Sequence, residues 1–130
     1  MTHSLTIEGA AVVTSDDNGT VHPRGWVHVV DNEIVGVGAG DAPAAARQAD
    51  EFLDARGCAV MPGMVNGHTH LFQTFFRGLG DDKSLLDWLR DYIWPGASVM
   101  TPEEIAAAAA VGIIENLRTG ATTVIDHQYI

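Results

Sequence analysis

The sequence is poor in three things: cysteine, basic residues and long apolar runs. Cys58 is the single cysteine, which excludes a disulfide within the chain and permits a reducing compartment. Only 7 Lys and Arg stand against 17 Asp and Glu, giving a net charge of −10, whereas phosphate binding needs clustered positive charge. The longest apolar run, residues 105–114, is too short to span a bilayer, and no signal-peptide pattern precedes it. We therefore expect a cytoplasmic protein that binds no nucleic acid and no membrane.

The first 59 residues predict short strands separated by turns. Loose alternation predicts a strand over residues 5–13, and residues 25–30 and 34–38 predict a hairpin that turns at Asp31-Asn32-Glu33. A further short strand is predicted over residues 51–54, and Cys58 beside the next apolar segment is expected to be a small buried residue. Short strands at this spacing indicate a small β-sandwich domain segment over residues 1–59.

From residue 60 the pattern changes to strand, helix, helix, strand. Ser84 and Asp87 predict a capping box with Asp in place of Glu, followed by a helix that Pro95-Gly96 ends. A second helix is expected from a capping box at Thr101 to Arg118.

The segment after the second helix completes this pattern. Gly120 is expected as the helix C-cap, and residues 122–126 predict a buried, β-branched strand. Strand, helix and strand form a parallel β/α unit, so residues 60–130 indicate an α/β fold.

Two histidines one residue apart, His68 and His70, close the first strand of this second part. Side chains alternate between the two faces of a strand, so this spacing directs both imidazoles the same way. Two imidazoles on one side of a strand end form half of a metal site. The pair follows an apolar run and a Pro62-Gly63 break, which places it where a strand meets a loop.

Residues 61–71, Met-Pro-Gly-Met-Val-Asn-Gly-His-Thr-His-Leu, closely resemble the first barrel strand of the amidohydrolase superfamily. Residues 73–78, 87–89 and 93–95 resemble its aminohydrolase branch, which includes deaminases of purines, pyrimidines and S-adenosylhomocysteine and the triazine chlorohydrolases. The resemblance covers nearly the whole chain but only the first part of a family member.

The resemblance implies the N-terminal part of a metal-dependent hydrolase (β/α)8 barrel, truncated over residues 60–130 and preceded by a composite β-sandwich domain over residues 1–59. A complete barrel needs at least about 200 residues, and residues 60–130 have room for two of its eight strands. Because an incomplete barrel leaves a strand edge unpaired, self-association of the isolated chain is expected.

The resemblance also implies that His68 and His70 bind one divalent metal ion, zinc or alternatively iron. The implied reaction is hydrolysis of a non-peptide C–N bond, the deamination of a small nitrogen heterocycle by metal-activated water. Triazine dechlorination is an alternative, as is a non-catalytic remnant. The further ligands and the proton-transferring aspartate lie on later strands in the family. We therefore expect the isolated 130 residues to be inactive.

Four further residues are candidate substrate contacts, and each has a structural alternative. Gln73 can orient a substrate by hydrogen bonding or lie in a solvated loop. Arg77 can instead pair with Asp81 or Asp82, and Trp88 can serve in packing. His127 is as well explained by exposure at a strand end as by a substrate pocket. The candidates are Gln73, Arg77, Trp88 and His127.

Overall fold

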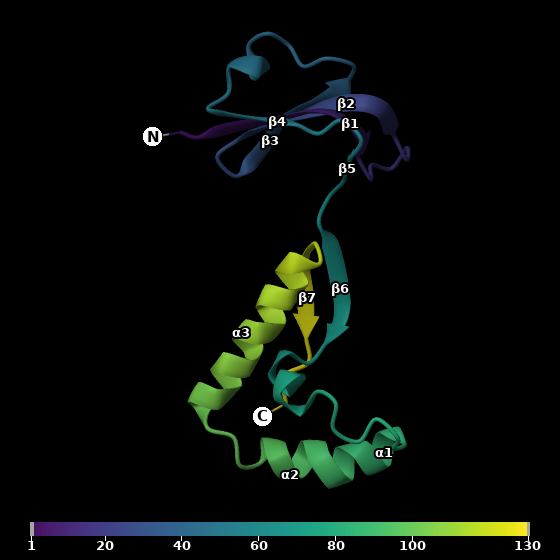
Figure 1. Ribbon diagram of the computed structural model, residues 1–130, viewed down its shortest axis with the longest axis vertical. Coiled ribbons are helices and arrows are strands. Elements are labelled where there is room, and N and C mark those ends of the chain that lie inside the picture. Colours follow the sequence, from purple (N-terminus) through teal and green to yellow (C-terminus); the bar gives the residue numbers. More distant parts are fainter. Residues whose placement is uncertain (1, 130) are drawn as a thin grey trace. The chain divides into compact units, whose positions relative to one another are not determined.

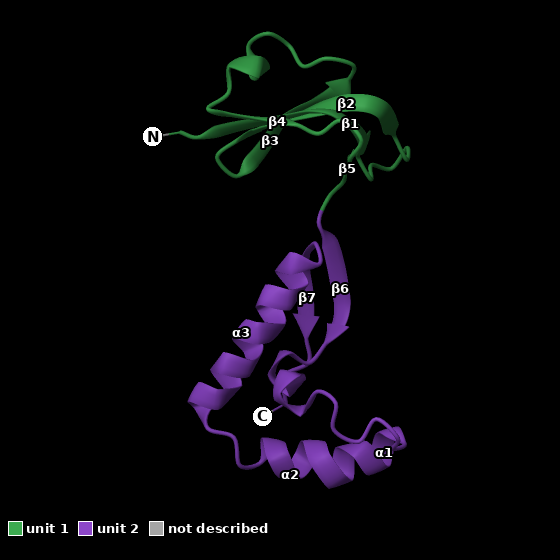
Figure 2. Ribbon diagram, in the orientation of Figure 1, with its two compact units in different colours: residues 1–62 green, residues 63–130 purple. Residues whose placement is uncertain are grey.

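The computed structural model describes residues 2–129 of the chain. They form two compact units, which divide between residues 62 and 63 and are coloured separately in Figure 2. Each unit has its own β-sheet, and the two sheets share no strand.

The first unit is built on one mixed five-stranded sheet (Figure 1). Its central strand β1 is antiparallel to β2 and parallel to β4 and β5, while β2 forms a hairpin with β3. The predicted hairpin and the strand over residues 51–54 are therefore confirmed. The elements are β1 (Ser4–Val13), β2 (Val21–Val30), β3 (Glu33–Ala39), the 3-10 helix η1 (Ala46–Gln48), β4 (Glu51–Asp54) and β5 (Ala59–Val60).

The core of the first unit lies where β1 meets β2. Ala10, Val12 and Val27 are buried there, and Thr6 is fully buried. The Thr6 hydroxyl satisfies its polarity by donating to the Ala46 carbonyl oxygen at 2.5 Å. The described part of this unit contains one sheet, so a second sandwich layer stays a prediction.

Cys58 is exposed, and the expectation that it is buried was wrong. It lies in the turn between β4 and β5 instead of within a strand, and its N–H donates to the Ala55 carbonyl. Turn residues lie on the surface because their backbone groups need solvent or local partners.

The second unit is a parallel β/α unit, as predicted. Strands β6 and β7 pair in parallel, with Met64 opposite Ala121 and Thr69 opposite Asp126, and α3 runs alongside them (Figure 1). The elements are β6 (Met64–Thr69), the 3-10 helix η2 (Leu71–Phe76), α1 (Leu85–Trp88), the π-helical η3 (Leu89–Ile93), α2 (Trp94–Ala97), α3 (Pro102–Arg118) and β7 (Ala121–Asp126).

The predicted end of the first helix at Pro95-Gly96 was wrong. The helical path continues from α1 through η3 and α2 to Ala97. The Trp94 N–H donates to the Leu89 carbonyl, an i→i−5 bond that widens the turn just before the proline. A proline ring clashes with the carbonyl four residues earlier in a regular α-helix, and the wider π turn relieves that clash.

Only half of the predicted capping box at Ser84 is present. The Ser84 hydroxyl accepts from the Asp87 N–H at 3.3 Å and donates to the Asp87 carboxylate at 2.7 Å. The carboxylate of Asp87 also accepts a hydrogen bond from the Arg90 guanidinium, at 2.8 Å. Aspartate is one methylene shorter than the glutamate of a capping box, so its carboxylate meets the serine hydroxyl instead of the serine N–H.

The termini of α3 match the prediction. Thr101 and Glu104 form the complete capping box, and Pro102 occupies the first helical turn. Gly120 follows the helix with φ +89°, a conformation that favours glycine, and its N–H donates to the Leu117 carbonyl. These caps fix where β7 begins.

The core of the second unit joins η2 to the helices. Phe72 of η2, Ile93 of η3 and Ala108 of α3 are all fully buried. At Gly112 a Cβ atom would lie 2.9 Å from Leu71 Cδ2, so glycine permits the close approach of α3 to η2. Strand β7 is not buried as predicted: Ile125 is 53% exposed, because β7 pairs only with β6 within the described residues.

Across residues 2–129, the structure has no helix whose length and hydrophobicity would let it cross a membrane.

Candidate metal and substrate site

His68 and His70 lie at the carboxyl end of β6 and bring their rings together. The ring centroids are 5.2 Å apart, with the ring planes nearly perpendicular at 88°. His127, just after β7, adds a third ring with its centroid 5.0 Å from that of His68 and 5.5 Å from that of His70. Parallel pairing of β6 with β7 brings both strand ends to one edge, which gathers the three imidazoles.

The His70 ring is held by one hydrogen bond from its Nδ1 to the main-chain carbonyl oxygen of His127, at 2.9 Å. A carbonyl oxygen only accepts, so Nδ1 carries the proton of this hydrogen bond, and in the neutral ring Nε2 keeps its lone pair. Metal-binding histidines commonly donate their other ring N–H to a carbonyl in this way. The hydrogen bond therefore leaves His70 in the form that can bind a metal through Nε2.

The histidine pair fits part of a metal site. Imidazole nitrogens are ligands that zinc and iron both accept. Within the described residues, however, no group of three or more His, Cys, Asp or Glu side chains has an arrangement that could hold a metal ion. His68 and His70 thus supply two imidazole nitrogens, which is about half of the usual tetrahedral zinc set.

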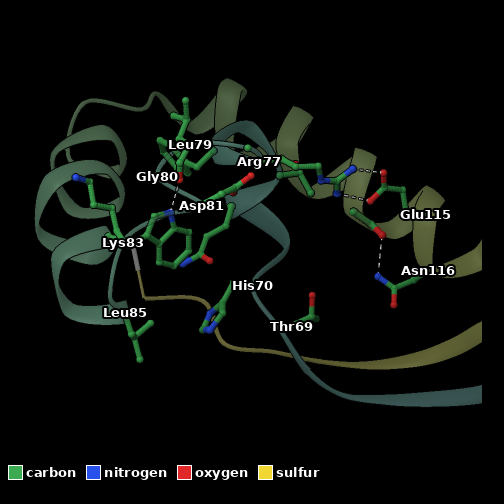
Figure 3. A pocket seen from close by; sticks show the side chains of 16 residues that line it. Thr69, His70, Arg77, Leu79, Gly80, Asp81, Lys83, Leu85, Glu115 and Asn116 are labelled. Carbon is green, nitrogen blue, oxygen red and sulfur yellow. Dashed lines mark hydrogen bonds and ion pairs between the residues drawn. The ribbon is translucent and has the colours of Figure 1, made fainter.

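A cavity of about 520 Å³ lies beside His70 in the second unit (Figure 3). Its size is within the range of small-molecule pockets. Its wall includes three of the four predicted substrate contacts, while His127 is in the histidine cluster instead of the wall. The polar and aromatic residues of the wall include His70, Gln73, Arg77, Trp88 and Glu115.

Arg77 pairs with Glu115 of α3, so the alternative pairing with Asp81 or Asp82 was wrong. Its two terminal nitrogens donate to the two carboxylate oxygens at 2.6 and 2.5 Å, and Figure 3 shows the two side chains directed at one another. The hydrogen bonds from Arg77 lower the pKa of Glu115, and those to Glu115 raise the pKa of Arg77. Both side chains stay largely in solvent, so the pair adds little stability.

Gln73 and Trp88 both make defined hydrogen bonds. The Gln73 side-chain amide donates to the Tyr129 hydroxyl at 2.6 Å, and the Trp88 indole N–H donates to the Leu79 carbonyl at 2.8 Å. The hydrogen bond to Tyr129 therefore fixes the Gln73 side chain, which is not free in solvent. Trp88 is half-buried and serves packing and the pocket wall together.

Tyr129 is a site residue that the sequence reasoning missed. Its ring meets the rings of His70 and Phe72 edge-on, with centroids 5.6 and 5.0 Å apart. The available signal was its position two residues after His127, the same i, i+2 relation that linked His68 to His70. Glu115 was missed as well, because its partner Arg77 lies 38 positions away in the sequence.

Curated relatives of similar sequence are named as deaminases. The chain is 41% identical over 126 residues to a 5-methylthioadenosine/S-adenosylhomocysteine deaminase of Nitratidesulfovibrio vulgaris, covering 97% of this chain and 28% of that protein. A deaminase of the same name from Haloquadratum walsbyi is 38% identical over 130 residues, covering 96% and 29%. The chain thus spans less than a third of the length of these curated relatives.

Two solved structures share the fold of the chain. An adenosine deaminase from Xanthomonas campestris with bound zinc matches with a TM-score of 0.84 and 35% identity, over 98% of this chain and 29% of that one. A variant atrazine chlorohydrolase from Arthrobacter aurescens TC1, complexed with zinc and atraton, matches with a TM-score of 0.83 and 26% identity, over 96% and 29%.

The family assignment rests on the part of the chain that carries the histidine pair and the pocket. Residues 59–130, more than half of the sequence, match the model of the amidohydrolase family. This segment contains β6, β7 and every residue of the site described above. The chain belongs to the amidohydrolase family.

Proposed function

We propose that the protein contributes the first part of a metal-dependent hydrolase that deaminates a small nitrogen heterocycle by cleaving a non-peptide C–N bond. The observation that carries the proposal is the His68–His70 pair beside a pocket of suitable size, in a chain 41% identical to a named deaminase. Zinc is the proposed metal, because two imidazoles suit it and the adenosine deaminase of similar fold binds zinc.

A bound zinc ion would supply Lewis acidity, which makes water a nucleophile at neutral pH. His70 would hold it through Nε2, since Nδ1 is committed to the His127 carbonyl, and His68 would hold it from the same strand end. Gln73, fixed by Tyr129, would direct its amide oxygen at the heterocycle, and Trp88 would offer an apolar wall. His127 would contact the substrate next to the histidine pair.

Deamination is favoured over triazine dechlorination by the comparisons. The relatives named as deaminases are up to 41% identical to the chain, whereas the chlorohydrolase structure is 26% identical. The (β/α)8 barrel, of which β6 and β7 would be the first two strands, is the proposed architecture of the whole enzyme. With a single cysteine, Cys58, the cytoplasm is the proposed compartment.

A chimera tests the proposed reaction. Residues 1–130 would replace the matching 29% of the Xanthomonas deaminase, whose remaining chain follows unchanged. We expect the chimera to bind zinc and release ammonia from adenosine or S-adenosylhomocysteine, and His70→Ala to abolish that release. The 130 residues alone should release none. A folded chimera that binds zinc without turnover would favour a non-catalytic remnant, and ammonia release by the 130 residues alone would contradict the assignment to part of a site.

Self-association is the proposed behaviour of the isolated chain. Among residues 2–129, strand β7 has one neighbour, β6, and Ile125 on it is 53% exposed. Unpaired strand edges with apolar side chains recruit further strands. Light scattering across a concentration series should show mass rising with concentration, and Ile125→Lys should reduce that rise because a charge opposes edge pairing. A monodisperse monomer at all concentrations would contradict the proposal.

A further inference from the structure

Residues 126 and 127, at the end of β7, contact His70 and its two chain neighbours at three points. The His127 N–H donates to the Thr69 carbonyl at 2.9 Å. The Asp126 carboxylate accepts from the Leu71 N–H at 3.0 Å. The His127 carbonyl accepts from His70 Nδ1 at 2.9 Å. The peptide before His70, the ring of His70 and the peptide after it are therefore all tied to β7.

The three contacts fix different degrees of freedom. The bond to Thr69 extends the β6–β7 ladder beyond Asp126, and the bond to Leu71 holds the first residue of η2. Between them His70 has φ −130° and ψ 86°, outside both the helix and the regular strand. The ring contact then sets both the rotation of the imidazole and the nitrogen that carries the proton.

We propose that the end of β7 is a clamp that presets His70 as an Nε2 ligand for a divalent cation, with Asp126 as a positioning residue. This inference rests on the proposed metal site. The hydrogen bond of the Asp126 carboxylate goes to the Leu71 N–H, so Asp126 would act on His70 through the Leu71 peptide. Residues that orient metal ligands without touching the metal commonly affect affinity about 10–100-fold.

Mutation can remove the side-chain contact of the clamp without removing its two main-chain contacts. His127 contributes only main-chain atoms to these two bonds, so His127→Ala keeps both bonds while it removes the ring whose centroid lies 5.5 Å from that of His70. Asp126 contributes a side-chain oxygen, so Asp126→Ala removes one contact while Asp126→Asn retains an acceptor of the same shape. The asparagine variant also separates hydrogen bonding from charge, because it lacks the negative carboxylate.

The test reads the His70 tautomer in the metal-free protein by ¹⁵N NMR, with His70→Gln used to assign the signals. We expect the Nδ1–H form of His70 to predominate in the unmodified protein and in the Asp126→Asn and His127→Ala variants. In Asp126→Ala we expect a mixture of both tautomers. Zinc titration of the same variants in the chimera with the zinc deaminase should show about 10–100-fold weaker binding for Asp126→Ala and unchanged binding for Asp126→Asn. Circular dichroism establishes that each variant is folded.

Several results would overturn the clamp. The first is an Nε2–H form of His70 in the unmodified protein, and the second is an unchanged His70 tautomer in folded Asp126→Ala. The others are a mixture of tautomers in His127→Ala and a loss of zinc affinity in Asp126→Asn as large as that in Asp126→Ala. If Asp126→Ala fails to fold, the tautomers of Asp126→Asn and His127→Ala still test the clamp. The expected tautomers in a chimera with the zinc deaminase that takes up no zinc would support the clamp and overturn the proposed metal site, so the two failures are distinguishable.

Discussion

Replacing His68 or His70 by alanine is expected to lower zinc affinity by at least about 100-fold, since each removes one imidazole ligand from a site that zinc fills with four. The other residues of β6 are Met, Val, Asn, Gly and Thr, so the strand offers no second imidazole, thiolate or carboxylate to replace a lost histidine. Elemental analysis and competition with a chelator would measure the loss. The chimera with the zinc deaminase is the best background, because two imidazoles alone should bind weakly.

His3→Ala is the matched control for these variants. His3 is an exposed histidine in the first unit, where it pairs with Glu51 at 3.1 Å. Its removal should leave zinc occupancy unchanged. Full occupancy in both His68→Ala and His70→Ala would rule out the histidine pair as ligands and would leave the pocket without a metal.

Phe72→Ala is expected to destabilise the second unit by about 3–5 kcal/mol, the cost typical of emptying a fully buried aromatic site. Phe72 is 0% exposed and lies two residues after His70, with its ring edge-on to Tyr129. Its loss removes apolar burial and leaves a cavity under η2. Urea unfolding followed by tryptophan fluorescence would measure the change.

The control for Phe72 lies three residues further along the same helix. Phe75 is 50% exposed, and Phe75→Ala should cost less than about 1 kcal/mol. A Trp26→Phe background restricts the signal to Trp88 and Trp94 of the second unit. Equal midpoint shifts for the two phenylalanine variants would mean that η2 does not form the core of this unit.

Much of the secondary structure could be predicted because its causes are local. The turn at Asp31 and the capping box at Thr101 are each specified within a few residues, and both are present. The first helix continues through Pro95 because the turn before it is a wider π turn. The presence of a proline does not by itself predict that wider turn. The exposure of β7 could not be predicted from its own residues, because burial depends on which strands pair beside it.

The part of the candidate site that depends on local spacing could be predicted, and the part that depends on distant partners could not. The spacing of His68 and His70 indicated a shared direction, and their rings do lie together. The partners of the other site residues come from distant positions: Glu115 for Arg77, Tyr129 for Gln73. Side-chain pairing across such separations depends on the tertiary fold, so local patterns gave only the residue types.

The pairing of β6 with β7 also bears on the order in which the chain folds. The bond between His70 and His127 closes a loop of 57 positions, whereas Val30 and Glu33 of the β2–β3 hairpin are almost adjacent. The entropy lost on closing a loop grows with its length, and pairings between distant residues form more slowly. The hairpin can therefore form early from its own residues, while the histidine cluster is assembled only after the intervening helices have brought the two strands together.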